Sequence, residues 1–190
     1  MCTRRFGTAL ATGLLLGVGL VSGVTACAPA APPMHPPAKT PVAQGHGGAV
    51  VSDTAESTQA GLDMLRHGGT AADAAVAVAA TLGVTDPYVA GIGGGGYFVY
   101  YDARTHRVST IDGRETTPAA DGPSMFIDPS TGKPLPFPAA VDSGLSVGVP
   151  GTLATWQHAL QQWGRFRLAE DLQPAEQVAE RGFVVDATFH

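Results

Sequence analysis

The hydrophobic pattern of the sequence becomes regular near residue 45, where a short apolar run is followed by a helical pattern. The run 48–52 (GAVVS) predicts a short buried strand. Asp53 follows at a predicted N-cap, and Glu56 stands three positions later, as in a capping box. We expect this first helix to extend to His67, because two consecutive glycines come next and glycine commonly ends helices.

A second helix is predicted over 71–82, and its composition differs from that of the first. Thr70 precedes it as a candidate N-cap, Asp73 occupies the capping-box position, and Gly83 is expected to end it. The segment is almost entirely Ala and Val. Such small side chains let neighbouring elements approach closely, so we expect this helix in the core of the domain and not on its surface.

The second half of the pattern adds a β-hairpin and two more helices. Aromatic and β-branched residues over 97–101 predict a strand, and 107–111 predicts its antiparallel partner across a short turn. A turn-rich stretch over 118–138 follows. Helices are then predicted over 151–163 and 168–181. Helices, then strands, then helices indicate an α+β protein in which helices pack on a sheet.

Composition narrows the class of protein. The 190 residues suffice for one domain with a sizeable core, and a hydrophobic content of 44% is not that of a disordered chain. The net charge of −5 argues against a nucleic-acid partner. The six histidines lack metal-ligand spacing, and no cysteine follows Cys27. We therefore expect neither a metal site nor a cofactor.

The N-terminus is predicted to be a targeting segment, a signal peptide over 1–26. Arg4 and Arg5 precede the uncharged apolar stretch 6–24, as in a secretory signal. Cys27 directly follows this stretch after small residues, which is the layout of a bacterial lipidation site. The alternatives are an ordinary signal peptide without lipidation and an uncleaved helical anchor.

A tether is predicted between this signal and the folded domain. Segment 27–44 begins with the lipidated Cys27 and is rich in Ala and Pro, a composition that favours extended polyproline conformations over packing. The domain proper is expected over 45–190. Together these features predict an exported protein, held by a lipid anchor on the extracytoplasmic face of the membrane.

Two short motifs match known patterns by their letters but not by their context. Segment 91–96 satisfies G-x-G-x-x-G, yet a helix is predicted before it and a strand after it, the reverse of a dinucleotide-binding turn. Segment 144–148 satisfies G-x-S-x-G around Ser146. It lacks both the preceding core strand and the immediate helix of a nucleophile elbow. We expect neither motif to act as its pattern suggests.

A set of short motifs follows one another along the domain. They are QAG at 59–61, LRHGG at 65–69, ADAAVA at 72–77, GIGGGGYF at 91–98, IDGRE at 111–115 with Pro118-Ala119, VPGT at 149–152 and GFVV at 182–185. In this order they resemble the gamma-glutamyltranspeptidase family, a branch of the N-terminal-nucleophile hydrolases. The resemblance covers the whole of 45–190, and its strength lies in the order of the motifs.

This resemblance implies a fold, a reaction and a binding residue. The fold is the α/β/β/α four-layer sandwich of N-terminal-nucleophile hydrolases, present here only in part. The reaction is transfer or hydrolysis of the gamma-glutamyl group of glutathione and related compounds. Arg114 matches the family arginine that grips the substrate's α-carboxylate, and a guanidinium suits that task because it binds a carboxylate bidentately. The plain alternative for Arg114 is a structural ion pair with Asp112 or Glu115.

The family nucleophile is a Thr in a Thr-Thr-His context, and no such motif occurs in the sequence. Thr116-Thr117 precedes Pro118 and lies in the arginine motif. No catalytic residue is therefore carried over. We expect the N-terminal part of a large subunit, inactive without its missing C-terminal part and small subunit. Alternative functions are another amidase of the superfamily, such as a cephalosporin acylase or a poly-gamma-glutamate processing enzyme, and a non-catalytic surface binding protein.

Overall fold

The computed structural model describes residues 42–189. The predictions of a signal peptide over 1–26, of lipidation at Cys27 and of most of the tether lie outside the described residues. No helix within residues 42–189 is long and apolar enough to cross a membrane.

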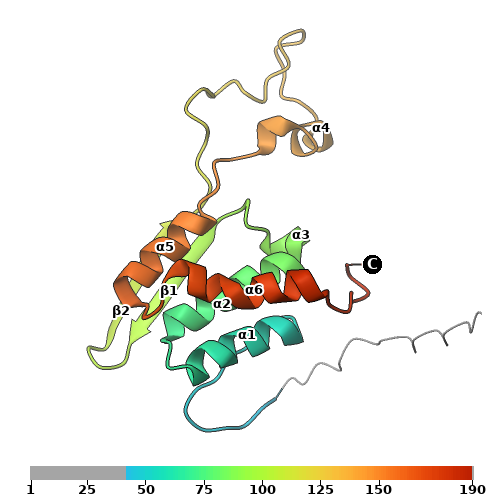
Figure 1. Ribbon diagram of the computed structural model, residues 1–190. Helices are drawn as coiled ribbons and strands as arrows, with labels where there is room; N and C mark the ends of the chain where they lie inside the picture. The colour runs from blue at the N-terminus through green and yellow to red at the C-terminus, as the bar shows by residue number, and fades with distance from the viewer. Residues whose placement is uncertain (1–41, 190) are drawn as a thin grey trace, which may run out of the picture. The chain divides into compact units, whose positions relative to one another are not determined.

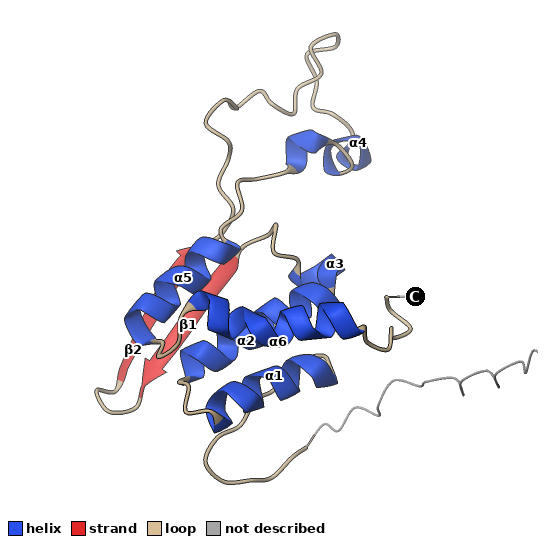
Figure 2. Ribbon diagram, in the orientation of Figure 1, coloured by secondary structure: helices blue, strands red, loops and turns tan. Residues whose placement is uncertain are grey.

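The described residues form helices packed on one β-hairpin, which confirms the α+β class (Figures 1 and 2). The helices α1, α2 and α6 lie together, and α5 packs against the hairpin. The elements in chain order are α1 (Ala55–Arg66), α2 (Ala71–Thr85), α3 (Pro87–Ala90), β1 (Gly96–Asp102), β2 (Arg107–Gly113), α4 (Phe137–Val141), the 3-10 helix η1 (Gly144–Ser146), α5 (Thr152–Trp163) and α6 (Leu168–Arg181).

The first helix begins one residue later than predicted. Its N-cap is Thr54, whose side chain accepts a hydrogen bond from the backbone N–H of Ser57, so the prediction of Asp53 as the cap was wrong. The helix ends at Arg66 with His67 as its C-cap, close to the predicted end. Gly68 follows at φ 88°, a conformation that glycine adopts without strain.

The predicted strand over 48–52 was also wrong. These residues form no strand, and Val51 is 94% exposed. They have no strand to pair with, because the described residues contain a single two-stranded sheet, made of β1 and β2. An apolar run becomes a strand only where another strand offers hydrogen bonds.

The second helix is the centre of the core, as predicted, but it is longer than predicted. The capping box of Thr70 and Asp73 is present. The helix passes through Gly83 and ends only at Thr85, before Asp86 and Pro87, so Gly83 is not its stop. Pro87, two residues past the end of the helix, is the stronger stop signal, because the residue before a proline disfavours the helical conformation.

Small residues let the helices around α2 pack closely. Val76 and Ala80 of α2 are buried against Trp156 of α5 and Ala175 of α6. On the opposite side, α1 approaches so near that a Cβ on Gly61 would lie 2.6 Å from a methyl group of Val78. The close approach of α1 to α2 therefore depends on the absence of a side chain at position 61.

A buried carboxylate joins the start of α2 to the turn between α5 and α6. Asp73 is fully buried, and it accepts hydrogen bonds from the backbone N–H groups of Thr70, Arg165 and Phe166. Burial acts to raise the pKa of Asp73, but the hydrogen bonds from Phe166, Thr70 and Arg165 outweigh it and hold the pKa below its usual value. Sequence segments 92 residues apart are thereby fixed to each other.

The β-hairpin has two different faces. Phe98 and Tyr100 point inward and stack on Trp163 of α5, with ring centroids 5.9 and 4.6 Å apart. The opposite face exposes Tyr97 and its same-face neighbours to solvent; these neighbours are Val99, Tyr101 and Val108. The predicted strands and their antiparallel pairing are confirmed.

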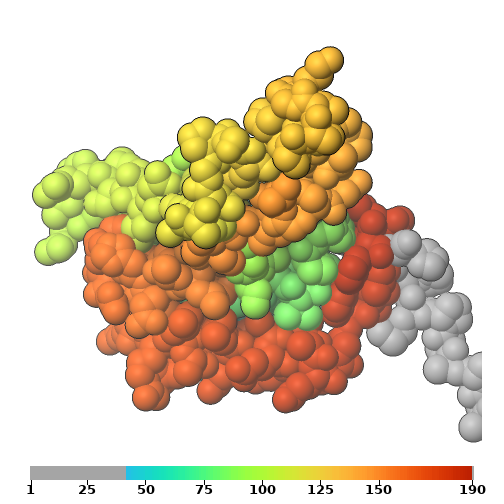
Figure 3. Space-filling view, turned by 90° about the horizontal axis from the view of Figure 1, so that it is seen from above, coloured from blue at the N-terminus to red at the C-terminus, as the bar shows by residue number. Residues whose placement is uncertain are grey.

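A long connecting segment lies between β2 and α5. It starts and ends at one β-bridge, in which Thr116 and Val149 exchange backbone hydrogen bonds of 3.3 and 2.8 Å. We call residues 117–148 the arm. It contains α4 and η1, and Figure 3 shows it in yellow to orange, running over this face of the molecule beside the hairpin. The helices predicted after it, α5 and α6, are confirmed.

Candidate functional site

Three motifs of the sequence meet where α5 begins. The backbone N–H groups of Gly151 and Thr152 donate to the carbonyl oxygen of Gly94, at 3.1 and 3.2 Å. These N–H groups lie at the start of α5, where the donors have no acceptor within the helix, and the glycine-rich run supplies the acceptor. The glycine run and the VPGT turn are thus held together by backbone groups alone.

Glycine is required here because backbones pass very closely. A Cβ on Gly95 would collide with the carbonyl oxygen of Gly113, and one on Gly151 would collide with the same oxygen. A Cβ on Gly113 would collide with the side-chain oxygen of Thr155 in α5. The glycines therefore build a wall of bare backbone next to the arginine motif.

Arg114 lies directly after β2, at the foot of the arm. Its backbone N–H donates to the Asp112 carboxylate at 3.1 Å, which shapes the turn. Its side-chain Nε lies 3.4 Å from Oε2 of Glu115, and 59% of the Arg114 side chain is exposed against 28% for Glu115. The ion pair expected as the plain alternative is therefore present, with Glu115.

This ion pair leaves the two terminal nitrogens of the Arg114 guanidinium unpaired among the described residues. It engages only Nε, and among residues 42–189 no hydrogen bond or ion pair occupies the two terminal nitrogens of Arg114. Glu115 is the more buried partner, and its Oε2 has no hydrogen-bond partner among the described residues, so the contact with Arg114 is electrostatic only. A fork of two free N–H donors is the arrangement that a carboxylate binds best.

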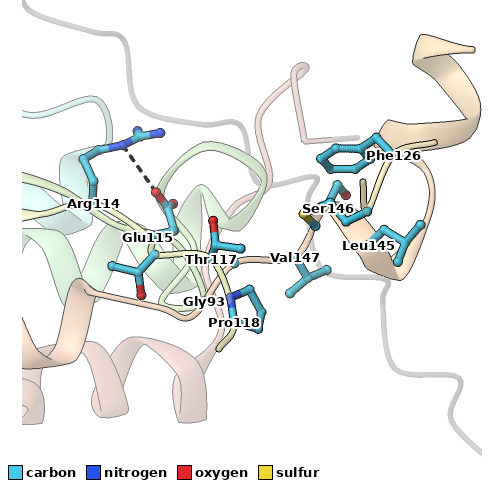
Figure 4. A pocket seen from close by; sticks show the side chains of 12 residues that line it. Gly93, Arg114, Glu115, Thr117, Pro118, Phe126, Leu145, Ser146 and Val147 are labelled. Carbon is cyan, nitrogen blue, oxygen red and sulfur yellow. Dashed lines mark ion pairs between the residues drawn. The ribbon is translucent and has the colours of Figure 1, made fainter. Parts of the chain in front are cut away.

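Arg114 borders an open cavity of about 560 Å³ on the surface of the molecule, and small-molecule sites commonly have volumes of roughly 300–1,000 Å³. In Figure 4, Arg114 and Glu115 lie on one side of the cavity, and Phe126, Leu145 and Val147 of the arm lie on the other. The remaining lining residues are Gly93, Thr116, Thr117, Pro118, Met125, Ser146 and Gly148. The site thus combines the arginine motif, the glycine run and both ends of the arm.

The two misleading motifs behave as their context predicts. The glycine run lies between α3 and the strand β1, so no helix N-terminus follows it to receive a pyrophosphate. Ser146 ends the 3-10 helix η1, and its hydroxyl donates to the backbone oxygens of Val141 and Ser143, both at 2.9 Å. This serine stabilises a turn and has none of the geometry of a nucleophile elbow.

The sequence analysis missed one unusual carboxyl group. Asp171 in α6 is fully buried, and neither of its carboxyl oxygens has a hydrogen-bond partner among the described residues. Burial, together with the nearby charges of Asp73 and Glu170, raises its pKa to about 7. The signal was available, because Asp171 shares one helical face with the buried Ala175 and Val178, at spacings of four and seven.

Within the part of the chain that the structure describes, no group of three or more His, Cys, Asp or Glu residues could hold a metal ion. The site consists of the pair of Arg114 and Glu115, the closely packed glycine backbone and the lining residues of the arm.

Known proteins are similar to this chain in sequence and in fold. The family model described as Gamma-glutamyltranspeptidase matches residues 57–190. The "Glutathione hydrolase proenzyme" of Bacillus subtilis (strain 168) is 42% identical over 143 residues, which cover 75% of this chain and 24% of that protein. The protein of the same name in Escherichia coli (strain K12) is 40% identical over 139 residues, covering 73% of this chain and 23% of its own length.

A solved structure agrees with these sequence relatives. The Helicobacter pylori gamma-glutamyltranspeptidase superposes with a TM-score of 0.70 at 34% identity, over 75% of this chain and 40% of that one. The predicted N-terminal-nucleophile hydrolase fold, present in part, is confirmed. The described residues supply helices and one hairpin of it. The chain spans about a quarter of the length of the curated relatives that it matches.

Proposed function

The chain belongs to the gamma-glutamyltranspeptidase family, and on that basis we propose that its protein hydrolyses or transfers the gamma-glutamyl group of glutathione and related compounds. The observation that carries this proposal is the exposed guanidinium of Arg114. It stands at the edge of a cavity of suitable size, beside a wall of bare backbone. An α-amino acid carboxylate is the ligand group that this arrangement suits.

In this proposal Arg114 binds the substrate's α-carboxylate through its two terminal nitrogens. The negative charge of Glu115, 3.4 Å from Nε, lies beside the guanidinium and leaves its terminal nitrogens for the substrate. Lysine at this position would keep the positive charge but would lose the bidentate geometry. The contribution of Arg114 is therefore geometric as well as electrostatic.

We further propose that the 190 residues do not turn over substrate alone. The sequence contains no Thr-Thr-His motif, and the family resemblance implies an N-terminal Thr nucleophile whose own amine acts as its base. That nucleophile would come from the missing C-terminal part, as a small subunit. The described residues would then provide the binding wall for one end of the substrate.

The remaining proposals concern location. We propose a signal peptide over 1–26, a lipidated Cys27 that begins a tether over 27–44, and the enzyme domain over 45–190. An anchored tether would hold the domain at the extracytoplasmic face of the membrane. Metabolic labelling with a fatty acid, compared between the natural protein and Cys27→Ser, tests the anchor: labelling that survives Cys27→Ser would refute it.

The alternatives from the sequence remain open at this level of detail. Another amidase, such as a cephalosporin acylase or a poly-gamma-glutamate processing enzyme, would keep the helices and the glycine wall. A non-catalytic surface binding protein would keep the cavity. The two terminal nitrogens of Arg114, which the pair with Glu115 does not use, favour a substrate with an amino-acid carboxylate over the general acylase alternative.

The experiment begins with the gene. The DNA beyond the His190 codon is sequenced, and the complete gene product is expressed and given a chromogenic gamma-glutamyl anilide. We expect self-cleavage of the product, release of the coloured amine, and a KM that is higher in Arg114→Lys by about 10-fold or more. A complete gene product that folds stably but releases no amine would contradict the enzymatic proposal.

A further inference from the structure

The carboxyl group of Asp171 is buried in an apolar part of the molecule. Asp171 is fully buried, and neither of its carboxyl oxygens has a hydrogen-bond partner among the described residues. Leu168 and Ala175, which lie three positions before and four positions after it in α6, belong to the apolar core that α6 forms with α2 and α5. Because a buried charge without a partner is costly, these surroundings favour the neutral acid over the carboxylate.

The charged groups on the neighbouring helices do not offset this burial. Asp73 is the only charged residue of α2, and its charge has the same sign. Burial, followed by the negative charges of Asp73 and Glu170, raises the pKa of Asp171 to about 7. On α5 the only titratable residue is His158, which is exposed and lies within hydrogen-bond distance of Gln162. The neighbouring charges therefore add to the preference for the neutral acid.

No arginine, lysine or histidine neutralises Asp171 within the part of the chain that the structure describes. Of the two arginines nearest to it in sequence, Arg165 donates to the Gly68 carbonyl at 2.9 Å, and Arg167 pairs with Glu170 at 3.1 Å. The other charged residues of α1 and α6 lie at the surface or line a groove beside the later turns of α6; they are Glu56, Asp63, Arg66, Glu176, Glu180 and Arg181.

The first turn of α6, residues 168–171, lies between a fixed point and an interruption of the helix. Before it, the turn from α5 is fixed to α2, because two of its backbone N–H groups donate to Asp73 at 2.9 and 3.0 Å. After it, Pro174 stands inside the helix and has no N–H to donate to the carbonyl of Glu170. The first turn is thus joined to the rest of α6 by one hydrogen bond fewer than in a regular helix, so it can move without the rest.

We propose that this first turn of α6 is a pH-dependent element, which packs on α2 while Asp171 is protonated and opens into solvent when Asp171 is ionised. Opening gives the carboxylate the contact with water that it lacks in the closed turn. The later part of α6 stays in place, since Ala175 and Val178 are buried on the far side of Pro174. None of the residues of the first turn lines the cavity beside Arg114, so the proposed function is not needed for this opening.

The direction of the pH dependence follows from the two states of the turn. In the open turn Asp171 has an ordinary pKa of about 4, whereas in the closed turn its pKa is about 7. The closed turn therefore holds the proton more tightly, and the stability of the closed turn is fully present below about pH 4 and is lost as the pH rises to about 7. Over this interval the opening constant rises about 10-fold per pH unit, because opening releases one proton, and it levels off above about pH 7.

Hydrogen–deuterium exchange of the complete gene product measures this opening. Exchange rates between about pH 5 and pH 8 are corrected for the pH dependence of exchange in unstructured peptides. They give opening constants for peptides that contain Leu172 and Gln173 of α6 and for peptides from residues 74–81 of α2. We expect the α6 peptides to open at least about 10-fold more readily than the α2 peptides. Their opening constant should rise about 10-fold per pH unit between about pH 5 and pH 6.5.

Matched variants separate the role of the acid from that of the proline. Asp171→Asn removes the ionisation, so we expect an opening constant that no longer changes with pH. Asp171→Leu should behave in the same way, and it replaces the Asn variant if that variant does not fold. Glu176→Gln, at an exposed position of the same helix, should keep the natural pH dependence. Pro174→Ala supplies the missing N–H, so we expect opening to fall about 5-fold with its pH dependence unchanged.

Each of three results would overturn the proposal. Equal opening constants for the α6 and α2 peptides would mean that the first turn exchanges only when the whole protein unfolds. A pH dependence that persists in Asp171→Asn and Asp171→Leu would mean that another group causes it. An opening constant that Pro174→Ala leaves unchanged would mean that the first turn does not move separately from the rest of α6.

Discussion

The helical core and the candidate site are held together in different ways. In the core, side chains make the contacts: α2 buries Val76 and Ala80, and Asp73 connects distant segments through its carboxylate. At the site, backbone groups do so: the Gly94 carbonyl receives two N–H groups, and bare glycines allow the chains to pass. The Arg114 side chain is left largely exposed. Stability and binding are therefore expected to respond to different substitutions.

The largest effect is expected from Asp73→Asn in the core. The amide replaces one of the two acceptor oxygens with an N–H donor, so either the backbone N–H of Thr70 or those of Arg165 and Phe166 lose their acceptor. We expect the free energy of unfolding to fall by about 3–5 kcal/mol, as measured by urea unfolding of the complete gene product. Asp63→Asn is the matched control, since Asp63 pairs with Arg66 at the surface. Equal losses in both variants would contradict the role of Asp73.

The next effect concerns pH and the buried Asp171. Its folded-state pKa is raised to about 7, so its neutral form is favoured in the folded protein. Stability from this group is fully present below the unfolded-state pKa and is lost as the pH rises toward 7. Relative to Asp171→Asn, the natural protein should lose on the order of 2–4 kcal/mol between pH 4 and pH 8.

Unfolding measured at several pH values checks this difference. Glu176→Gln, at an exposed position of the same helix, is the control. The stability difference between Asp171→Asn and the natural protein should change with pH, while the Glu176→Gln difference should stay level. If the difference in unfolding free energy between Asp171→Asn and the natural protein did not change with pH, burial would not raise the pKa of Asp171, and the prediction would be wrong.

A smaller effect distinguishes two glycines of one run. Gly95→Ala places a Cβ against the backbone oxygen of Gly113, whereas a Cβ on Gly93 meets nothing within 4 Å. We expect Gly95→Ala to lower the free energy of unfolding by about 1–3 kcal/mol and Gly93→Ala to change it by about 0.5 kcal/mol at most. Thermal unfolding compares the two; similar losses would show that the glycines serve flexibility and not close approach.

The sequence predicted the core better than its edges. The bounds of α6 and the paired residues of the hairpin follow from local hydrophobic periodicity. The capping box at Thr70 follows from hydrogen bonds between residues close in sequence. The strand expected over 48–52 fails because a strand needs a partner, which no local pattern supplies. Gly83 fails as a helix stop because the packed surface of α2 continues past it.

The candidate site was predicted only in part. Arg114 was proposed from its motif, and its binding role stays a prediction. The contribution of the arm to the cavity lining was not predicted, since Phe126 and Val147 are brought there by the closure of a long segment at the bridge of Thr116 and Val149. Such a site depends on a pairing between residues 116 and 149, and the spacing of hydrophobic residues does not predict that pairing.

One measurement tests most directly whether binding and stability are separate in this molecule. In the complete gene product, the dissociation constant for L-glutamate and the free energy of unfolding without ligand are determined for the natural protein, for Arg114→Lys and for Asp73→Asn. We predict that Arg114→Lys weakens binding by about 10-fold or more and leaves unfolding unchanged. We predict the converse for Asp73→Asn in conditions where it remains folded. Unchanged glutamate binding in Arg114→Lys would contradict the account.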